Sequence, residues 1–330
     1  MKVLEFFSGI GGMHFALKGS EIESEVLLAV DINPVSNEIY KYNFPDVHLV
    51  NRNIQSLSPN FLNKLGADTI LMSPPCQPFT RNGSKGDVND PRSQALIHIL
   101  NILPHINISR ILIENVKGFE TSQMRDLVVQ TFDKCGFSYQ EFLLSPSQIG
   151  IPNSRLRYYC LAKKAPYKFE FDTGPLIYNL PNQSENSLKF KIGDILEAGD
   201  KEQYYLPMKI LKKYWKVLDI CYEDSQRSCC FTKAYNRYYE GTGSVFSHIS
   251  KNDAQKILQE LKTQTLDESS QEFLLSSLKL RYFTPSEVSK LQCFPEHFKF
   301  PKMITNRQKY MVLGNSINVE VVSNLINLLT

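Results

Sequence analysis

The sequence predicts an α/β fold, with a doubly wound, mostly parallel sheet in the first half of the chain and a smaller, irregular domain in the second half. Three observations lead to this prediction. Short apolar runs alternate with helical patterns up to residue 165, which is typical of parallel strands joined by helices. The chain of 330 residues is long enough for two domains, and 42% of its residues are hydrophobic. Beyond residue 165, several prolines and a polar stretch at 182–187 end the alternation.

Four apolar runs of the first half are expected to be strands, each followed in the chain by a segment of helical pattern. The expected strands are Val3–Phe7, Val26–Val30, Ile70–Met72 and Arg110–Ile113. The expected helices run through Leu17 and over Pro34–Tyr42, Ala95–Leu103 and Met124–Cys135. In such sheets ligands bind beyond the carboxyl ends of the strands, so the residues that follow these strands are the candidates for a site.

The second half has fewer regular elements. Lys251–Lys262 is expected to be an exposed helix and Asp267–Gln271 a polar loop. Ile317–Leu329 has the apolar pattern of one more helix for the first domain. We therefore place one domain at 1–165 plus 281–330 and a second, smaller one at 166–280.

Composition excludes several classes of protein. No run approaches the roughly 18–20 apolar residues of a membrane span, and Glu5 lies where a secretory signal needs apolar residues, so neither insertion nor export is expected. Seven cysteines without a C-x-x-C pair argue against a disulfide framework and favour a reducing compartment, where Cys229 and Cys230 are expected to be free thiols. Six histidines without an H-x₃₋₅-H pair predict no structural metal.

The net charge of +3 is too small to indicate a nucleic-acid partner by itself, but its distribution is uneven. Residues 201–237 carry eight basic and four acidic side chains, interleaved with aromatic residues. Such a mixture suits a polyanion with exposed bases, and the candidate contacts are Lys209, Lys212, Lys213 and Lys216. A solvated helix face over an aromatic core predicts the same pattern, so both interpretations stay open.

A glycine-rich loop, SGIGG at 8–12, follows the first expected strand and precedes a helix. Backbone N–H groups at such a helix N-terminus can hold a carboxylate or a phosphate. The loop is an incomplete dinucleotide fingerprint, but Asp31 ends the second strand, at the position from which an acid binds ribose hydroxyls. Together these features favour an adenosine-bearing ligand over the alternative, a tight turn with a helix cap.

The motif SPPCQPF at 73–79 follows another strand. Its prolines stiffen the turn and present Cys76 at the tip, which disfavours the usual role of a cysteine as a small buried hydrophobe. A thiol in this place would be a nucleophile, and nearby arginines or a helix N-terminus can lower its pKa.

Two further motifs bring charge to the same edge of the sheet. Glu114 and Asn115 end an apolar strand. Burial there raises the pKa of a glutamate, so Glu114 could stay protonated and act as a proton donor. The alternative is that Glu114 is an acidic cap on the next helix. Arg155 and Arg157 alternate in an expected strand, so both guanidiniums would face one side and could hold a phosphate or polarise a carbonyl. A surface strand with ion pairs is the alternative for these two arginines.

The series FSGIGG, PPCQPF, ENV, R-x-R and a late GNS resembles the cytosine-5 methyltransferases, over residues 1–165 and 280–330. CFTK at 230–233, EGTGSV at 240–245 and LRYFTP at 280–285 resemble the eukaryotic "DNA methyltransferase 2" group, which methylates aspartate tRNA. The resemblance implies a Rossmann-like methyltransferase fold and S-adenosylmethionine as cofactor, with S-adenosylhomocysteine as product. It also implies methylation of C5 of an anticodon-loop cytosine, position 38, through a covalent cysteine adduct.

The resemblance also implies a role for each matching position. Cys76 matches the nucleophile that attacks C6 of cytosine, and Glu114 matches the acid that contacts N3 and the exocyclic amine. Arg155 and Arg157 match the arginines that orient the base. The implied cofactor contacts are Ile10, Gly11, Gly12, Asp31, Ile54, Gln55, Ser73 and Ser316. The implied substrate contacts are Pro75, Gln77, Thr80, Arg81, Asn115, Cys230, Phe231, Thr232 and Lys233. The segment 80–92 matches the one that closes over the substrate, with Gly83 and Gly86 as hinges.

The chain departs from the family pattern in two places. Asn53 stands where many DNA-methylating relatives have an acid for the adenine amino group, and Asn153-Ser154 stands where Gln often precedes the R-x-R motif. The first alternative function is the same chemistry on DNA, and the second is a non-catalytic nucleic-acid-binding protein that keeps the cofactor fold. The resemblance further implies a monomer with at most weak DNA binding, located in the cytoplasm with the nucleus as a second location.

Overall fold

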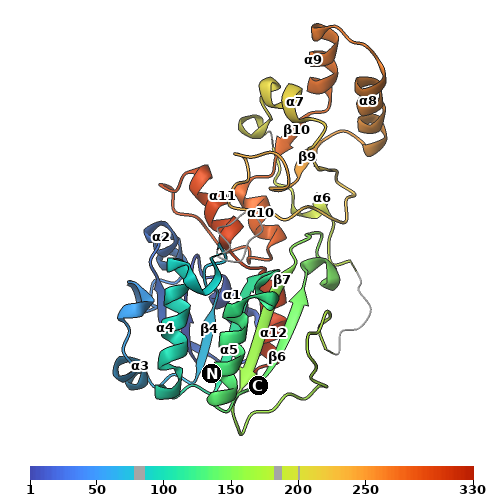
Figure 1. The fold of residues 1–330 in the computed structure, drawn as a ribbon. Helices are drawn as coiled ribbons and strands as arrows, with labels where there is room; N and C mark the ends of the chain where they lie inside the picture. Colours follow the sequence, from blue (N-terminus) through green and yellow to red (C-terminus); the bar gives the residue numbers. More distant parts are fainter. Residues whose placement is uncertain (78–85, 182–187, 200) are drawn as a thin grey trace.

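The computed structural model describes residues 1–77, 86–181, 188–199 and 201–330, and its largest element is a seven-stranded sheet (Figure 1). The strand order is β3-β2-β1-β4-β5-β7-β6. The strands are β1 (Lys2–Phe6), β2 (Glu25–Asp31), β3 (Leu49–Asn51), β4 (Thr69–Met72), β5 (Arg110–Val116), β6 (Ser138–Leu144) and β7 (Arg157–Lys163). Neighbouring strands from β3 to β5 are parallel, whereas β7 is antiparallel to both β5 and β6. The predicted mostly parallel sheet is confirmed.

Helices cover both faces of this sheet (Figure 1). They are α1 (Gly12–Gly19), α2 (Pro34–Asn43), α3 (Pro59–Leu65), α4 (Gln94–Ile102), α5 (Gln123–Lys134) and α12 (Val319–Asn327). Successive strand residues point to opposite faces: Leu112 packs in the core cluster with α1 and α12, while Ile111 and Ile113 pack in the cluster with α4 and α5. The late helix predicted from the sequence is confirmed, and it begins at Val319 because Asn318 caps it, accepting a hydrogen bond from the N–H of Val321 at 3.1 Å.

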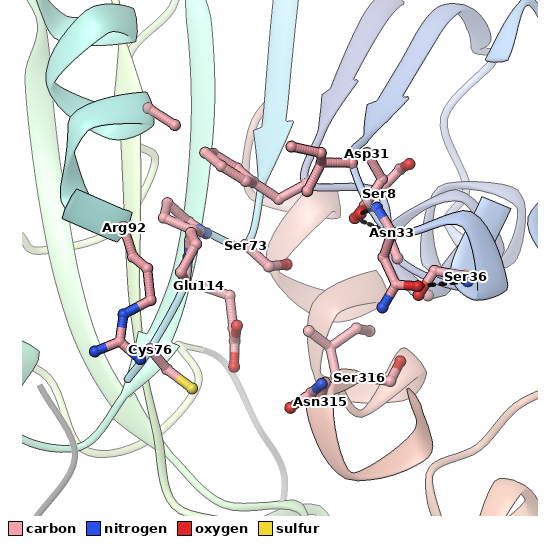
Figure 2. A pocket seen from close by; sticks show the side chains of 18 of the residues that line it. Ser8, Asp31, Asn33, Ser36, Ser73, Cys76, Arg92, Glu114, Asn315 and Ser316 are labelled. Atoms are coloured by element: carbon pink, nitrogen blue, oxygen red, sulfur yellow. Dashed lines mark hydrogen bonds between the residues drawn. The ribbon is translucent and has the colours of Figure 1, made fainter. Parts of the chain in front are cut away.

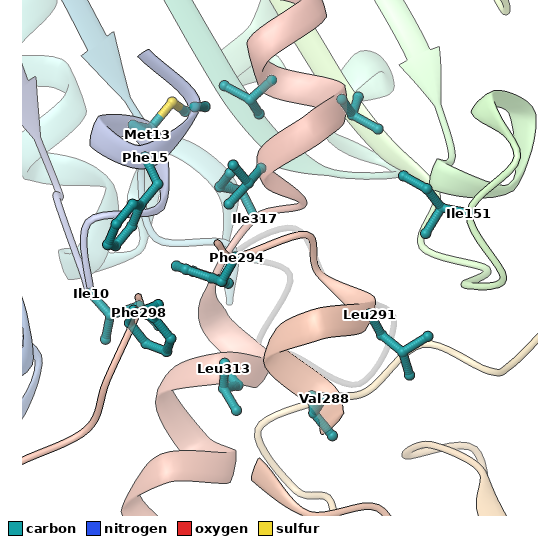
Figure 3. Packing of buried hydrophobic residues seen from close by; sticks show 14 of the residues in the cluster. Ile10, Met13, Phe15, Ile151, Val288, Leu291, Phe294, Phe298, Leu313 and Ile317 are labelled. Atoms are coloured by element: carbon teal, nitrogen blue, oxygen red, sulfur yellow. The ribbon is translucent and has the colours of Figure 1, made fainter. Parts of the chain in front are cut away.

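The chain returns to the carboxyl edge of the sheet with α10 (Pro285–Leu291) and α11 (Asn306–Asn315), which lie between the two parts of the molecule (Figure 1). Figure 3 shows the apolar contact that holds them there. The ring of Phe15 on α1 meets Phe294 and Phe298 edge-on, with ring centroids 5.6 Å apart in both pairs. The last third of the chain is therefore packed directly against the helix that follows the glycine-rich loop.

The second part is built on a three-stranded sheet of order β10-β9-β8. Its elements are β8 (Ile220–Cys221), β9 (Val245–Ser247), β10 (Leu280–Tyr282), α6 (Ile192–Ile195), α7 (Met208–Tyr214), α8 (Lys251–Thr263) and α9 (Glu268–Ser277). The helix predicted at 251–262 is confirmed as α8. The polar loop predicted at Asp267–Gln271 is wrong, because Asp267 caps α9: its Oδ1 accepts from the N–H of Ser270 at 2.7 Å.

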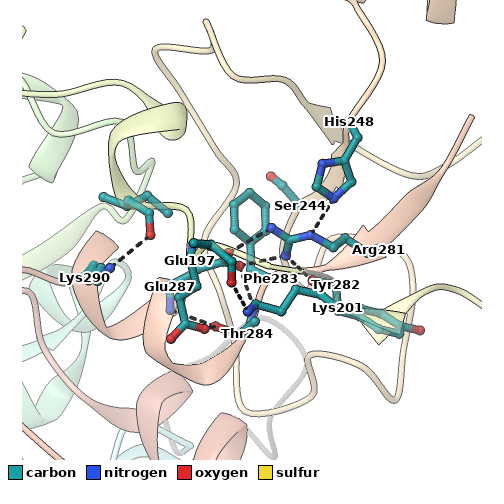
Figure 4. A network of polar contacts seen from close by, with 12 residues as sticks. Glu197, Lys201, Ser244, His248, Arg281, Tyr282, Phe283, Thr284, Glu287 and Lys290 are labelled. Atoms are coloured by element: carbon teal, nitrogen blue, oxygen red, sulfur yellow. Dashed lines mark hydrogen bonds and ion pairs between the residues drawn. The ribbon is translucent and has the colours of Figure 1, made fainter. Parts of the chain in front are cut away.

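A buried ion pair anchors the small sheet to α10 (Figure 4). Arg281 on β10 is 1% exposed, and its two terminal nitrogens donate to both carboxylate oxygens of Glu287 at 2.8 Å. The backbone N–H groups of Glu197 and Thr284 donate to the same carboxylate at 3.0 and 2.8 Å. A buried charge that is paired on every side fixes the relative position of the elements that hold it.

The domain limits at residues 165 and 280 stay a prediction. Phe169, Phe171 and Ile177 lie beyond the first limit, yet they pack against the core cluster of the large sheet that contains Phe142 and Tyr159. Within the described part of the chain, no helix has the length and apolarity needed to cross a membrane.

Candidate active site

A cavity of about 440 Å³ opens at the carboxyl edge of the large sheet (Figure 2). Its lining comes from the ends of β1 to β5 or the segments that follow them, from residues 91–95, from Arg155 and Arg157, and from the end of α11 and the turn before α12. In Figure 2, Ser8 and Asp31 lie at one end of the cavity, whereas Cys76 and Glu114 lie at the other. Motifs that are far apart in the sequence thus share one space, as the sheet topology predicts.

All four residues predicted to be catalytic line the cavity, as do most of the predicted cofactor contacts. The latter are Ile10, Gly12, Asp31, Ile54, Gln55, Ser73 and Ser316, and Gly11 is not among the lining residues. Of the predicted substrate contacts, Pro75 and Gln77 line the cavity, while Thr80, Arg81 and the hinge Gly83 lie outside the described residues.

Several lining residues have no counterpart in the sequence prediction, among them Ile32, Asn33, Ser36 and Arg52, whereas Arg92 belongs to the predicted segment 80–92 and Asn315 to the GNS motif. Ile32 follows Asp31 directly and is 65% exposed despite its large apolar side chain. Its exposed side chain at the cavity wall is available to an apolar part of a ligand. Asn33 caps α2, Ser36 lies in its first turn and Arg52 follows β3, and nothing in the sequence context of these three residues singles them out.

The glycine-rich loop takes a shape that two of its glycines make possible. Gly9 has φ 53° and its N–H donates to Asp31 Oδ2 at 2.9 Å. Gly11 has φ 85°, and a Cβ there would lie 2.6 Å from Cε2 of Phe44, so a side chain is excluded both by backbone conformation and by packing. Gly11 therefore packs against Phe44 and is not among the residues that line the cavity.

Asp31 is fixed by backbone donors on both of its carboxylate oxygens. Gly9 donates to Oδ2, and the N–H of Asn33 donates to Oδ1 at 2.7 Å. Burial raises the pKa of Asp31, and these backbone hydrogen bonds oppose that rise. The carboxylate is thus held rigidly at the end of β2, where an acid can bind ribose hydroxyls.

The cavity fits the adenosine-bearing ligand predicted from the sequence. Its volume lies within the range of small-molecule sites. Ser8 Oγ is buried in the lining and has no hydrogen-bond partner among the described residues, so it is available to a ligand. A Cβ on Gly12 would lie 3.0 Å from Ser316 Oγ, so the glycine brings the start of α1 against the turn before α12.

Asn53, the first departure from the family pattern, is hydrogen-bonded to Gln55. Its side chain accepts a hydrogen bond from the N–H of Gln55 at 3.0 Å and donates to Gln55 Oε1 at 2.9 Å. Asn53 thereby caps the short turn at Ile54–Ser56 while it lines the cavity. An acid could perform the same capping, so the turn does not explain why this position is an amide.

The end of β5 holds the turn that carries Cys76. Asn115 Nδ2 donates to the carbonyl oxygen of Pro74 at 3.3 Å. Glu114, 7% exposed, faces the cavity, and Arg157 Nε lies 3.5 Å from its Oε1. The thiol, the carboxyl group and one guanidinium therefore occupy the same end of the cavity, supported by adjacent strands.

Burial and charge set the protonation of this end. Burial raises the pKa of Glu114 above its ordinary value, against the charges of Arg157 and Arg155, as the sequence predicts. The pKa of the Cys76 thiol is also raised, first by burial and then by the Glu114 carboxylate. Arg157, Lys233 and Arg155 lower it, as expected of cations, but they do not outweigh the rise. When Glu114 is protonated it loses its negative charge, and burial is then the one of these two causes that still raises the pKa of the Cys76 thiol.

The two arginines differ in position. Arg157 begins β7, but Arg155 precedes the strand, so the prediction that both share one strand face is wrong. Their guanidiniums nevertheless converge on Cys230 Sγ, at 3.6 Å from Arg155 Nη1 and 3.7 Å from Arg157 Nη2. Burial alone would raise the pKa of the Cys230 thiol, yet the two guanidiniums bring it below its ordinary value. All seven cysteines are free.

The basic stretch at 201–237 divides into two kinds of lysine. Lys212 Nζ pairs with Glu268 at 2.5 Å and also with Glu272, both on α9, so it joins two helices. Trp215 and Leu211 are buried in the core of the small part, as the helix-face interpretation requires. Lys209, Lys213 and Lys216 are exposed, and their role as RNA contacts stays a prediction. Among the residues that the structure describes, no group of histidine, cysteine and acidic side chains could hold a metal ion.

Known proteins resemble this chain in sequence and in fold. The sequence matches the family described as C-5 cytosine-specific DNA methylase over residues 1–330. A tRNA (cytosine(38)-C(5))-methyltransferase of Spodoptera frugiperda is 48% identical over 330 residues, covering 99% of this chain and 98% of the relative. A DNA (cytosine-5)-methyltransferase of Dictyostelium discoideum is 36% identical over 370 residues, covering 100% of this chain and 94% of the relative. The crystal structure of a Spodoptera frugiperda DNMT2 mutant is similar with a TM-score of 0.91, at 47% identity and 99% coverage of both chains.

Proposed function

Because the chain belongs to the C-5 cytosine-specific methylase family, we propose that it methylates C5 of cytosine 38 in the anticodon loop of aspartate tRNA, with S-adenosylmethionine as methyl donor. The observation that carries the proposal is the convergence of Cys76, Glu114 and Arg157 at one end of a cavity whose other end contains Asp31 and the glycine-rich loop. The tRNA specificity is supported by the name of the Spodoptera frugiperda relative that is 48% identical.

The residues present suit an attack on cytosine. C5 of cytosine is a poor nucleophile, so Cys76 first adds through sulfur to C6 while Glu114 donates a proton to N3, which leaves electron density at C5. When bound, S-adenosylmethionine supplies an electrophilic methyl group. Loss of the C5 proton, return of the N3 proton to Glu114 and departure of the Cys76 thiolate then restore the aromatic base.

Each supporting residue has a defined part in this scheme. Burial raises the pKa of Glu114, which favours the protonated form that can donate to N3. Arg157, paired with Glu114 across 3.5 Å, is placed to orient the base through its carbonyl oxygen. Asn115 keeps the Cys76 turn in place through the carbonyl of Pro74.

An RNA loop is a favourable substrate for a reaction on a single unpaired base. A target base has to leave its stack before its ring reaches Cys76, and a base in an anticodon loop is already partly unstacked. A duplex DNA substrate requires a further few kcal/mol for unpairing and unstacking. The name of the Dictyostelium discoideum relative nevertheless makes DNA the alternative to test.

The test is transfer of labelled methyl from S-adenosylmethionine to total tRNA, to tRNA depleted of the aspartate species, and to duplex DNA. Label in total tRNA that is absent from the depleted pool is the expected result. Label in DNA alone keeps the chemistry and overturns the substrate. No label in any pool, with S-adenosylhomocysteine still bound, favours a non-catalytic binding protein.

The Cys76→Ala variant tests the covalent step in the same assay. We expect no detectable label and unchanged S-adenosylhomocysteine affinity, because Cys76 lies at the end of the cavity opposite Asp31. Cys135→Ala is the matched control, since Cys135 lies at the end of α5 and is not among the lining residues. Turnover by Cys76→Ala would exclude the covalent mechanism.

A further inference from the structure

One buried guanidinium joins two segments that are far apart in the sequence. Arg155 is 2% exposed. Its Nη1 donates to the carbonyl oxygen of Phe231 at 3.2 Å and lies 3.6 Å from Cys230 Sγ. Its Nη2 donates to the carbonyl oxygen of Gly314 at 3.2 Å and also to that of Ser316. Both terminal nitrogens thus donate to backbone carbonyl oxygens of the protein itself.

The segment on the Nη2 side belongs to the cavity. Gly314, Asn315 and Ser316 all line it, and Figure 2 shows Asn315 and Ser316 at its wall. A Cβ on Gly12 would lie 3.0 Å from Ser316 Oγ, so this turn also touches the glycine-rich loop. A ligand that fills the cavity therefore contacts the turn whose carbonyl groups Arg155 binds.

The segment on the Nη1 side, 230–233, belongs to the second part of the molecule. A Cβ on Gly314 would lie 2.1 Å from the backbone nitrogen of Lys233 and 2.2 Å from the carbonyl carbon of Thr232, so the two backbones are in direct contact. Lys233 is exposed, and its charge lowers the pKa of the Cys76 thiol. The segment thus packs against Gly314 and, through Cys230 Sγ, lies beside Arg155 and Arg157, which line the cavity.

The planar guanidinium makes these contacts interdependent. Its donors point in fixed directions, so a shift of either segment leaves buried N–H groups or carbonyl oxygens unpaired, which is costly. Ordering of one segment therefore orders the other. A first ligand that fixes the turn reduces the entropy that a second ligand must lose at 230–233.

We propose that Arg155 is a positioning residue that couples the cofactor cavity to the segment 230–233, so that S-adenosylmethionine and tRNA bind cooperatively. This inference rests on the proposed function, which names the two ligands. Coupling of this kind is reciprocal and amounts to about 5-fold or more in affinity. Arg155 thereby differs from Arg157, which contacts Glu114 and Cys230 Sγ but, among the residues that the structure describes, has no hydrogen bond to Gly314 or Ser316.

The test measures exchange and affinity separately. Hydrogen–deuterium exchange is followed in peptides covering 228–235 with and without S-adenosylhomocysteine, and the Kd for aspartate tRNA is measured under the same two conditions. Arg155→Lys keeps the charge but has one ammonium group that cannot span four acceptors. Gly314→Ala changes the same contact from the side of α11, because its Cβ would push against the backbone of Thr232 and Lys233. Arg157→Lys is the matched control.

In the wild type we expect S-adenosylhomocysteine to slow exchange at 228–235 and to tighten tRNA binding by about 5-fold or more. In Arg155→Lys and Gly314→Ala we expect both effects to be lost, with the tRNA Kd changing less than about 2-fold on addition of S-adenosylhomocysteine. Arg157→Lys should keep the coupling while turnover falls. If neither variant folds, the wild type decides the matter, because exchange at 228–235 that bound S-adenosylhomocysteine does not slow overturns the coupling.

The opposite outcomes are equally clear. Equal protection in the wild type and in Arg155→Lys, or no protection in the wild type while S-adenosylhomocysteine binds, would overturn the coupling. The protein could also show protection at 228–235 that depends on Arg155 and yet not label tRNA. That result would support the coupling through Arg155 and overturn the proposed substrate. The two proposals can therefore fail independently.

Discussion

The protonation states of Cys76 and Glu114 depend on one another. The Glu114 carboxylate raises the pKa of the thiol, while burial raises the pKa of Glu114 itself. Protonation of Glu114 therefore both prepares the donor for N3 and makes the Cys76 thiolate easier to form. The mechanism needs both changes at once, and the proximity of the two side chains supplies them together.

The Glu114→Gln variant should lower the pKa of the Cys76 thiol, because it removes a negative charge while keeping the shape of the side chain. The same variant should reduce kcat by about 10²–10⁴-fold, the usual contribution of a general acid, and leave the Kd for tRNA nearly unchanged. The thiol pKa is read from the pH dependence of iodoacetamide modification of the peptide that contains Cys76. The exposed Glu296→Gln is the control.

Two results would contradict this prediction. One is an unchanged or raised thiol pKa in Glu114→Gln, and the other is an equal loss of tRNA binding and of rate. The first would show that the carboxylate does not act on the thiol, and the second would show that Glu114 binds substrate without a role as an acid.

At the level of single elements, the sequence predicts strands well where apolar residues are continuous. β1, β2, β4 and β5 lie within a few residues of their predicted places. β6 is not predicted because its interior contains Gln140 and Glu141, both buried, and Glu141 is paired with Arg125. The start of α9 is polar and resembles a loop until the cap at Asp267 is seen. Buried ion pairs and caps are contacts that hydropathy alone does not reveal.

The glycine-rich loop gives a prediction at this scale, because its two left-handed glycines differ in their surroundings. Gly9 has open space at its Cβ position, whereas Gly11 faces Phe44 at 2.6 Å. Gly9→Ala should destabilise the fold by roughly 1–2 kcal/mol through backbone strain alone. Gly11→Ala should add a further ~1–3 kcal/mol from overpacking and weaken S-adenosylhomocysteine binding. Urea unfolding of both variants provides the comparison, and equal losses would contradict the packing argument.

For the whole molecule, the sequence predicts which edge of the sheet contains the site but not how the second part reaches it. Strand ends bring Asp31, Cys76 and Glu114 together by topology alone. The contact of Gly314 with the backbone of 232–233 joins segments about eighty residues apart, and no periodicity reports it. The antiparallel placement of β7 between β5 and β6 is equally invisible in the sequence, since an antiparallel strand inside a buried sheet has the same apolar pattern as a parallel one.

The stability of the whole fold should depend on pH through Glu5. This residue is fully buried in β1, where the hydroxyl of Tyr40 donates to its Oε2 at 2.7 Å. Burial raises its pKa to about 8 from an ordinary value of 4.5. Between these two values the unfolded chain has lost the proton and the native state keeps it, so stability falls as pH rises and becomes level above pH 8. The slope from this group is at most about 1.4 kcal/mol per pH unit.

Glu5→Gln should remove that slope. The free energy of unfolding of Glu5→Gln minus that of the wild type should therefore increase from about pH 5 to about pH 8 and then stay constant. Urea unfolding at several pH values measures the difference, and Glu25→Gln, at an exposed position of β2, is the control. A difference that does not vary with pH would show that Glu5 is ionised in the native state.

The restriction of the cavity to one edge of the large sheet has a consequence for directed evolution. Most polar lining residues lie at or just after strand ends and beside the turn before α12, outside the two core clusters. Ile54 and Ile317 line the cavity but also belong to these clusters, so a mutant library confined to 31–33, 52, 53, 55, 315 and 316 varies the shape of the cavity while leaving the core residues unchanged. Selection on such a library can explore new methyl donors or new bases. The fraction of unfolded variants should be small, because the mutations change the cavity lining and leave the core positions as they are.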